Sequence, residues 1–404
     1  MSTSILYHGF GIRGYQYLKT EYQKGAVIFH IVKDPNKQRC AECGSRDVKK
    51  KGRITRKIRT IPIGKKKVFF SLNLHRLKCK VCRSLKLEPL LISFPKKHWT
   101  KNLGRYVVEL LKRMTVEDVA RQLGMSWDTV KEIHLWALKQ KFKKRKLREL
   151  HYLGVDEIAV RRGHRYLTVV VDLETGQVVW VGEGRQSSSL EGFMRTLKQR
   201  RVEIKAIAMD MWSAYMKAVL KYYPEEVIVF DRYHVIQDCN RMLDELRRTE
   251  AATASLKERK EVYTGTRYLL LKGKEKIEDN TAAKEKLNHL LALNESLHTA
   301  YLLKEELRTL WDCPSREDAE ELFDNWLWKA WSSDIEFLVK FANKLSRHRK
   351  GILNYFDNRI TTGQVEGINN KIKVLKRQAY GYRDKEYFKL RIYYLHESRY
   401  ALIG

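Results

Sequence analysis

The amino-acid sequence predicts a multidomain α/β protein, and two observations lead to that prediction: a change of hydrophobic pattern along the chain and an uneven distribution of charge. Residues 151–235 mix strand-like apolar runs with helical segments, and residues 236–350 keep helical spacing throughout. With 404 residues the chain is long enough for two to four domains. We therefore expect a mixed sheet, in which three strands form a meander and β-α-β units follow, and then a long helical region.

Positive charge is concentrated in the first part of the chain. Residues 1–150 hold 37 Lys and Arg against 11 Asp and Glu, a net of +26, whereas residues 151–404 hold 43 against 37, a net of +6. So basic a surface attracts nucleic acid, because binding releases the counterions of the phosphate backbone. The first part therefore has the composition of a polyanion-binding module, which solubility alone does not explain.

The lengths of the apolar runs indicate in which cellular compartment the protein is expected. The first 19 residues lack a long apolar run and a small-residue cleavage site, and runs such as 166–173 are only strand-length. The sequence thus predicts neither a secretory signal nor a membrane span. We expect a cytoplasmic protein that acts on the nucleoid and has no membrane partner.

Four of the six cysteines form two CxxC pairs in a module expected over residues 1–100. The pairs are Cys40 with Cys43 and Cys79 with Cys82. Four thiolates satisfy tetrahedral zinc, so the spacing predicts one structural Zn²⁺ in a zinc-ribbon-like fold, with a β-ribbon between the pairs. Four unrelated buried cysteines and a redox CxxC are the alternatives. Cys239 and Cys313 stand alone and are expected to be ordinary buried residues.

Residues 101–148 have the pattern of a helix-turn-helix. Thr115 can cap a helix, Gly124 permits a turn, and Ser126 can cap a second helix. That second helix would present three side chains to a major groove: Trp127, Asp128 and Lys131. A generic helical hairpin is the alternative reading of these residues alone.

Three acids stand apart from the others. Asp156 lies in the first strand of the α/β region, Asp210 ends a later apolar strand, and Glu366 lies on a helix. In a ribonuclease H-like sheet the first and fourth strands are neighbours, so Asp156 and Asp210 would lie side by side, and a packed helix could add Glu366. Such carboxylates repel one another unless cations intervene, which predicts two Mg²⁺ (or Mn²⁺) ions per active site.

Two nearby acids compete with or accompany these three. Asp231 ends the strand that follows Asp210, close to His234, and is the competitor for the second position. We prefer Asp210 because its strand is the fourth in order, and we assign Asp231 and His234 auxiliary roles. Glu157 neighbours Asp156 and should point to the opposite face of the strand.

With these motifs the chain resembles bacterial insertion-sequence transposases of the ISL-three family. The resemblance covers nearly the whole chain and rests on the paired CxxC motifs and on four blocks: 154–157 (GVDE), 210–215 (DMWSAY), 230–235 (FDRYHV) and 362–382 (TGQVEGINNKIKVLKRQAYGY). It implies a catalytic DDE triad of Asp156, Asp210 and Glu366. The implied layout is a zinc module over 1–100, a helix-turn-helix over 101–148, a ribonuclease H-like domain over 149–235 and 355–404, and an all-helical insertion over 236–354.

The resemblance implies a DNA transposase. It would bind the terminal inverted repeats of an insertion sequence, hydrolyse the DNA at its ends and join the 3′-OH ends to target DNA by two-metal-ion phosphoryl transfer. Its partners would be double-stranded DNA and further copies of the chain, in a homodimer or higher oligomer. A DNA-binding regulator without catalysis is the alternative, which the three acids argue against. A structure-selective nuclease would not need two separate DNA-reading modules.

Two further groups of residues have an implied role with an alternative beside it. Asn370, Lys373 and Arg377 follow Glu366 at helical spacing and would hold the backbone of the cleaved strand, unless they form a solvated basic face. In some transposases an aromatic residue of the insertion stacks on a flipped base. The candidates here are Trp326, Trp328 and Trp331, and packing into a helical core is the alternative for all three.

Overall fold

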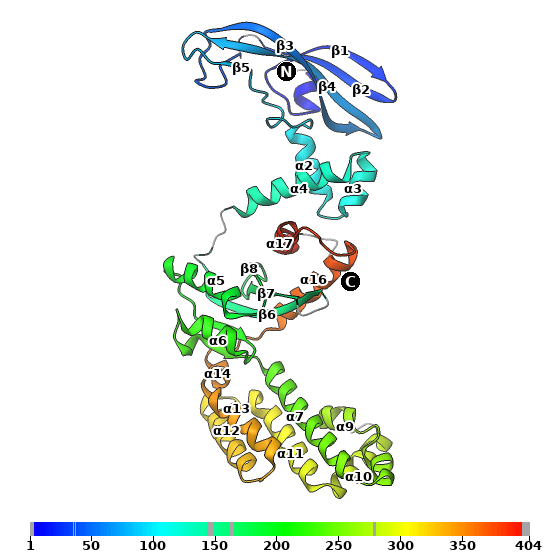
Figure 1. Cartoon of the computed structure of the whole chain (residues 1–404), viewed down its shortest axis with the longest axis vertical. Coiled ribbons are helices and arrows are strands. Elements are labelled where there is room, and N and C mark those ends of the chain that lie inside the picture. Colours follow the sequence, from blue (N-terminus) through cyan, green and yellow to red (C-terminus); the bar gives the residue numbers. More distant parts are fainter. Residues whose placement is uncertain are drawn as a thin grey trace. The chain divides into compact units, whose positions relative to one another are not determined.

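The computed structural model describes residues 4–34, 36, 38–143, 147, 149–161, 165–277 and 280–397 (Figure 1). The chain forms two compact units, of which the first comprises residues 1–144 and 375–404 and the second residues 145–374. In the part of the chain that the structure describes, no helix is both long and apolar enough to span a membrane.

The first unit begins with a five-stranded sheet. Its strands are β1 (Tyr15–Gln23), β2 (Ala26–Lys33), β3 (Val48–Ile63), β4 (Lys66–Cys79) and β5 (Leu85–Leu87), after a short helix α1 (Ile5–His8). The order is β1-β2-β4-β3, with β5 also paired to β4. Alternate residues of β4 are buried, among them Phe70 and Leu72, because successive side chains of a strand point to opposite faces. The long β3–β4 ribbon pairs Val48 with Cys79 and so brings the two CxxC motifs to one end, as expected.

Three helices follow, α2 (Lys101–Leu110), α3 (Val116–Leu123) and α4 (Trp127–Phe142). Thr115 and Asp118 form a capping box at the start of α3, and Ser126 caps α4 by accepting a hydrogen bond from Thr129 N. Gly124 adopts a left-handed conformation (φ 56°), which permits the sharp turn between α3 and α4. The expected caps and turn of the helix-turn-helix are therefore present.

The last described helices pack on α4 within the same unit. They are α17 (Lys385–Tyr393) and the short 3-10 helix η6 (Leu395–Glu397). Tyr387 and Tyr394 form a buried cluster with Leu138, and Tyr387 Oη lies 2.8 Å from His134 Nδ1. This apolar cluster buries α17 within the same compact unit as the helix-turn-helix.

The second unit is built on a mixed five-stranded sheet. Its strands are β6 (Tyr152–Arg161), β7 (Arg165–Asp172), β8 (Val178–Glu183), β9 (Ala206–Met209) and β10 (Ile228–Phe230). The order is β10-β9-β6-β7-β8, in which β6, β7 and β8 are antiparallel, and β9 and β10 are parallel to β6. Three segments connect the strands: α5 (Ser187–Gln199), α6 (Ser213–Leu220) and η2 (Glu225–Val227). The expected meander and β-α-β units are observed.

Between β10 and α16 (Gly363–Gln378) the described chain is helical. The helices are α7 (Arg232–Thr253), α8 (Leu256–Glu258), the π-helix η3 (Arg259–Tyr263), α9 (Arg267–Leu271), η4 (Lys274–Lys276), α10 (Thr281–Leu293), α11 (Glu295–Thr309), η5 (Leu310–Asp312), α12 (Arg316–Trp331), α13 (Glu336–Arg347), α14 (Arg349–Leu353) and α15 (Tyr355–Asn358). Their apolar faces and the sheet share one continuous core. The helical region and the sheet therefore fold as one unit.

The three tryptophans of α12 differ in environment. Trp326 is fully buried and donates from Nε1 to Leu303 O at 2.7 Å, so it is a core residue. Trp328 is 67% exposed, and Trp331 is partly exposed and donates to Asn343 Oδ1. The two isolated cysteines also differ: Cys239 is buried as expected, whereas Cys313 is only partly buried.

Candidate active site and metal cluster

Two of the three singled-out acids lie at the same edge of the second sheet. The parallel pair β6–β9 aligns Gly154 with Ala208. Asp156 lies two residues further along β6, and Asp210 is the first residue after β9. Asp156 is also paired with Val169 of β7, so it lies in the middle of the sheet. Because parallel strands end at a common edge, these two carboxylates are neighbours, as the strand order predicted.

Each of these carboxylates is held by specific donors. Asp156 Oδ2 accepts from Asn369 Nδ2 of α16 at 2.8 Å, and its Oδ1 accepts from the backbone N–H of Glu157 at 2.8 Å. Asp210 Oδ1 accepts from the backbone N–H of Trp212 at 3.1 Å. The side chains are therefore oriented before any ligand arrives.

The electrostatics of this edge are those of crowded acids. Burial raises the pKa of Asp156 and of Asp210, and the neighbouring carboxylates raise both further while His234 lowers them. Burial, then Asp210 and then Asp156, raises the pKa of Glu157 to about 7. The acids at this edge thus carry an excess of negative charge, which a bound cation would offset.

Two buried acceptors at the same edge fit a cation as well. Glu157 Oε2 and Asn369 Oδ1 have no hydrogen-bond donor among the described residues. Glu157 Oε1 also lies 3.9 Å from a guanidinium nitrogen of Arg185. Oxygen ligands of this kind suit Mg²⁺ or Mn²⁺.

Helix α16 lies against the sheet beside β6 (Figure 1). A Cβ on Gly154 would come within 2.4 Å of Val365 Cγ2, so the absence of a side chain there lets α16 approach the strand closely. Asp231 fixes the start of the helix, because its Oδ2 accepts from Thr362 N at 2.7 Å. Its Oδ1 accepts from Tyr233 N at 2.8 Å and caps α7. Both oxygens of this buried residue are therefore occupied by backbone donors.

Glu366 lies in the first turn of α16 and is exposed. Asn369 follows it by three residues and so lies near the same helical face. The predicted backbone-binding residues Asn370, Lys373 and Arg377 are all exposed on α16, and Lys373 Nζ donates to Asn370 Oδ1 at 3.3 Å. Helix α16 thus combines a buried apolar stripe with a polar one that begins at Glu366.

Sequence reasoning named Asn370 but missed Asn369. The signal was available in the spacing: Asn369 follows Val365 by four residues, and Val365 belongs to the buried stripe with Ile368 and Ile372. An amide on the border of a buried stripe is the one that meets the strand beneath it.

Only one cluster in the described part of the chain brings three or more His, Cys, Asp or Glu ligand atoms within 4.8 Å of one another, and it is the four-cysteine cluster. The carboxylates of Asp156, Asp210 and Glu366 do not meet that criterion. A two-metal site does not require it, because its ions are about 3.5–4 Å apart and each carboxylate need reach only its own ion.

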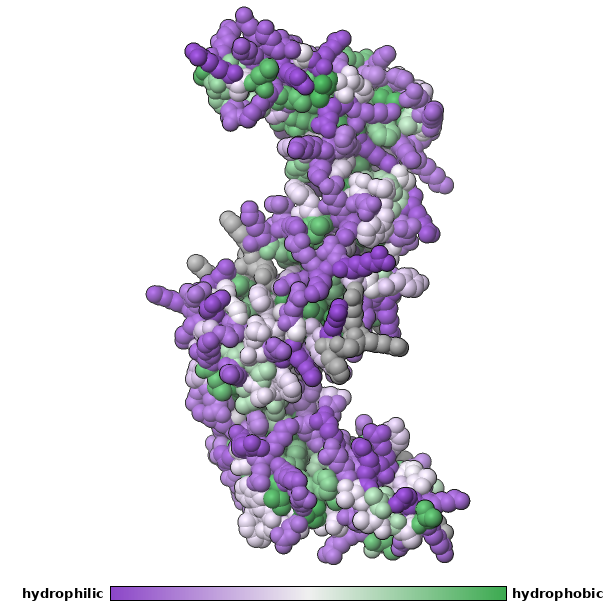
Figure 2. Space-filling view, viewed as in Figure 1, coloured by the Kyte–Doolittle hydropathy of each residue, from purple (hydrophilic) through white to green (hydrophobic). Residues whose placement is uncertain are grey.

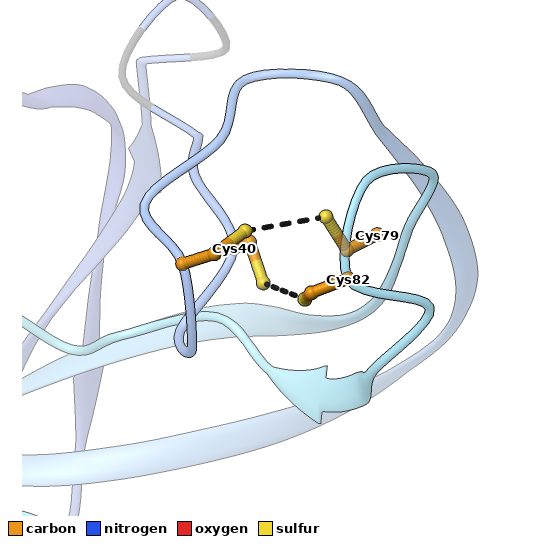
Figure 3. A group of neighbouring side chains, drawn as sticks. Cys40, Cys79 and Cys82 are labelled. Atoms are coloured by element: carbon orange, nitrogen blue, oxygen red, sulfur yellow. Dashed lines mark hydrogen bonds between the residues drawn. The ribbon is translucent and has the colours of Figure 1, made fainter.

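The four cysteines lie between two loops with their sulfur atoms turned toward one another (Figure 3). Cys40 Sγ is 3.6 Å from Cys82 Sγ, and Cys43 Sγ is 3.6 Å from Cys79 Sγ. These distances are far too long for disulfides and are close to the edge of about 3.8 Å of a tetrahedron of sulfurs around zinc. The cluster therefore fits one tetrahedral metal ion.

The groove-facing residues expected on α4 differ in availability. Trp127 and Asp128 are exposed in its first turn. Lys131 instead forms an ion pair with Asp384, 2.9 Å away, and lies over the rings of Trp127 and Tyr387. Sequence reasoning did not foresee this pairing because Asp384 is 253 residues further along the chain.

Three family models match the chain. Residues 153–392 match a model described as transposase, the DDE transposase of ISL3. Residues 95–133 match the helix-turn-helix domain of transposase family ISL3, and residues 36–82 match the zinc finger of the transposases IS204, IS1001, IS1096 and IS1165. Together with the α/β domain and the four-cysteine cluster, these matches define the class of protein as a transposase. The chain belongs to transposase family ISL3.

Named relatives agree with this assignment. The transposase for insertion sequence element IS1001 of Bordetella parapertussis is 33% identical, over 87% of each chain. The transposase for insertion sequence element IS1557 of Mycobacterium tuberculosis is 28% identical, over 86% of this chain and 83% of that one. Among solved structures, the Drosophila P element transposase strand transfer complex gives a TM-score of 0.41 at 10% identity, over 73% of this chain and 91% of that one.

Proposed function

We propose that this transposase binds the terminal inverted repeats of an insertion sequence, cuts the DNA at its ends and joins the 3′-OH ends to target DNA, with Asp156, Asp210 and Glu366 as the catalytic acids. The observation that carries the proposal is the meeting of β6, β9 and α16. Asp156 and Asp210 are crowded at the common edge of two parallel strands, and Asn369, one turn from Glu366, is bonded to Asp156.

The domain that carries these acids is, in this proposal, ribonuclease H-like. Three antiparallel strands followed by two parallel ones, with the first strand in the centre, support that assignment. In this proposal the helices between β10 and α16 are an insertion that precedes Glu366 in the sequence. The position of α16 beside β6 does not depend on how many residues separate β10 from α16.

Asp156, Asp210 and Glu366 would hold two Mg²⁺ or Mn²⁺ ions. The fit rests on the crowded carboxylates, whose pKa values are raised by burial and by neighbouring acids, and on the unpaired acceptors of Glu157 and Asn369. When bound, such ions lower the pKa of an attacking water and stabilise the departing 3′ oxygen in an in-line displacement at phosphorus.

The chain's own residues orient the acids and the DNA. Asn369 and the N–H of Glu157 fix both oxygens of Asp156, and Asp231 fixes the start of the helix that presents Glu366. Lys373 and Arg377 would hold the phosphates of the cut strand, since they lie on the helical face that starts at Glu366. No side chain of the protein needs to attack the DNA, because water and then the freed 3′-OH serve as nucleophiles.

End recognition belongs to the first unit in this proposal. The sheet with the four-cysteine cluster would hold one structural Zn²⁺, and Trp127 and Asp128 on α4 would meet the major groove. Exposed lysines on β3, namely Lys49, Lys50 and Lys51, would contact phosphates. Figure 2 shows hydrophilic residues interspersed with hydrophobic ones over this sheet. We propose a homodimer or higher oligomer on DNA, because two transposon ends must be cut and joined together.

A cleavage assay with the full chain tests this function. The substrates are labelled duplexes from both flanks of its gene, with a duplex of shuffled sequence as the control. We expect strand cleavage at the end sequences in Mg²⁺ or Mn²⁺ and none in EDTA. Cleavage in EDTA would refute the two-metal reading, and end binding without cleavage in either metal would favour a DNA-binding regulator.

A further inference from the structure

A pocket of about 650 Å³ lies where strand β8 ends and helices α5 and α6 begin, and Trp212, two residues after Asp210, lines it. This volume lies within the range of about 300–1,000 Å³ that is usual for ligand pockets. Its wall includes two aromatic side chains, Tyr166 and Trp212, and two cations, Arg185 and Lys217. Neither the catalytic acids nor the DNA-binding helices account for it.

Arg185 is held in place by the two aromatic rings. Its guanidinium carbon lies 4.5 Å from the ring centre of Tyr166 and 5.0 Å from that of Trp212. Trp212 Nε1 also donates to the backbone oxygen of Arg185 at 3.0 Å. The contact between the Arg185 guanidinium and Glu157 is long, at 3.9 Å, so the planar guanidinium of Arg185 can still donate hydrogen bonds to an anion.

The remaining wall adds further attraction for an anion. Lys217 is exposed on α6 and has no ion-pair partner among the described residues, and Glu183 is the one acid of the pocket wall. Helices α5 and α6 both begin at the pocket, without a side-chain cap and without an acid in the first turn. Their first N–H groups therefore add to the field of Arg185 and Lys217.

The pocket is fixed to the catalytic edge through Trp212. Its backbone N–H donates to Asp210 Oδ1 at 3.1 Å, and its ring is 38% exposed at the pocket. If a DNA strand has its scissile phosphate at Asp210, the nucleotide next to that phosphate can therefore reach this pocket.

We propose that this pocket binds one unpaired nucleotide of the cut DNA strand, with a phosphate on Arg185 and Lys217 and the base against Trp212. The proposal rests on the proposed function, since it places the scissile phosphate at Asp210. Arginine and lysine recognise phosphate, and an exposed indole recognises the face of a base. The nucleotide is unpaired because a base within a duplex has both faces covered by its neighbours.

Fluorescence of end duplexes with one 2-aminopurine, moved position by position across the end, tests the proposal with the full chain. In the wild-type complex we expect one position next to the cleavage point where the base leaves the duplex and stacks on Trp212. Trp212→Ala should lose that signature, and Trp212→Phe should keep it because it retains a ring. Leu220→Ala, an exposed change at the other end of α6, is the matched control.

The same variants are compared for cleavage and for end binding by mobility shift. Trp212→Ala should cleave about 5- to 100-fold more slowly, the range expected when one base stack is removed, with end binding nearly unchanged. Arg185→Gln should show a similar loss that Arg185→Lys does not restore, because lysine lacks the planar fork. An identical fluorescence signature and cleavage rate in wild type and Trp212→Ala would overturn the proposal.

Two further outcomes separate this inference from the function on which it rests. If the wild-type chain cleaves no end in either metal, the proposed function fails. The fluorescence of the bound duplex still shows whether the pocket binds an unpaired base. If free deoxyadenosine monophosphate binds without DNA and depends on Arg185, the site serves a free nucleotide, and the assignment to the cut strand is wrong.

Discussion

Asn369 donates a hydrogen bond to Asp156 across 2.8 Å and so joins helix α16 to strand β6 at the edge where the acids gather. Asn369 is 5% exposed, and its Nδ2 also lies 3.4 Å from the backbone oxygen of Glu157. The contact orients Asp156 and sets the distance at which α16 presents Glu366. In the proposed function Asn369 acts through Asp156, as a positioning residue.

Asn369→Ala should therefore weaken metal use more than DNA binding. Removing a partner that orients a metal ligand costs about 10- to 100-fold in metal affinity or activity. We expect the Mg²⁺ concentration for half-maximal cleavage to rise, with end binding by mobility shift unchanged. Asn370→Ala is the matched control, because Asn370 is exposed on α16 and is proposed to contact DNA, so its loss should affect substrate binding instead. Equal metal curves for the two variants would contradict the assignment.

Neutralising a catalytic acid should remove activity and raise stability at once. Buried carboxylates at one edge repel each other, and burial together with this repulsion raises the pKa of Asp210, so its charged form destabilises the folded state at neutral pH. Asp210→Asn should abolish cleavage and joining, leave end binding intact, and raise the Tm in EDTA. Mg²⁺ should raise the Tm of the wild type but not of the variant.

Asp231→Asn tests whether Asp210 or Asp231 is the second catalytic aspartate. Both Asp231 oxygens accept from backbone N–H groups, so this variant should lower the Tm and reduce cleavage only in part. Asp156→Asn and Glu366→Gln should behave like Asp210→Asn in the cleavage assay. Full cleavage by Asp210→Asn with complete loss in Asp231→Asn would show that the second catalytic aspartate is Asp231.

Gly154→Ala should disturb the active site by displacing helix α16 from strand β6. The added Cβ would lie 2.4 Å from Cγ2 of Val365, which is on α16, and 2.9 Å from Leu173 Cδ2. We expect a loss of about 1–3 kcal/mol in the free energy of unfolding, as for other overpacked sites, and slower cleavage because α16 carries Glu366. The double variant Gly154→Ala, Val365→Ala makes room for the methyl group and should recover part of the cleavage rate. A double variant no better than Gly154→Ala would exclude this steric cause.

The features that sequence patterns predicted are those that local rules determine. The capping box of Thr115, the left-handed Gly124 and the ribbon between the CxxC pairs all follow from residues close in the chain. The neighbouring positions of Asp156 and Asp210 followed from strand order alone.

Long-range packing decided what the sequence did not predict. Asp384 pairs with Lys131, and Tyr387 and Tyr394 bury α17 against α4, and both contacts join segments that are far apart in the sequence. Asn369 was missed in favour of Asn370 because one residue changes the direction of a helical side chain by about 100°. Such choices depend on which helix face meets which strand, and a single sequence does not contain that information.

Removing half of the cysteine cluster should release the zinc. In Cys79→Ser with Cys82→Ser two thiolates remain, which cannot close a tetrahedral shell. Metal analysis of purified wild-type chain should give about one zinc per chain, and the variant should give much less. The β3–β4 ribbon should then become protease-sensitive near its cysteine end, since the two loops are no longer tied. Stoichiometric zinc in the variant would refute the ligand set.

DNA binding by the first unit should show two separable contributions, phosphate neutralisation and base reading. Replacing Lys49, Lys50 and Lys51 of β3 by Gln should weaken binding to every DNA sequence alike. It should also lessen the slope of log K against log salt by about 0.9 for each phosphate that the variant no longer neutralises. Trp127→Ala should instead reduce the preference for end DNA over shuffled DNA and leave the slope unchanged. The control replaces three exposed lysines of the helical region, Lys257, Lys284 and Lys286, by Gln.

These measurements belong in the full chain. A fragment that ends near residue 145 would lack Tyr387 of α17 and Tyr394 just after it, which pack with Leu138 of α4. Weak binding by such a fragment would thus reflect an exposed core as much as a missing DNA-binding residue. If the β3 triple variant and the control keep the same salt slope, the basic ribbon does not touch phosphates. If Trp127→Ala retains the full preference for end DNA, sequence is read by other residues than those at the start of α4.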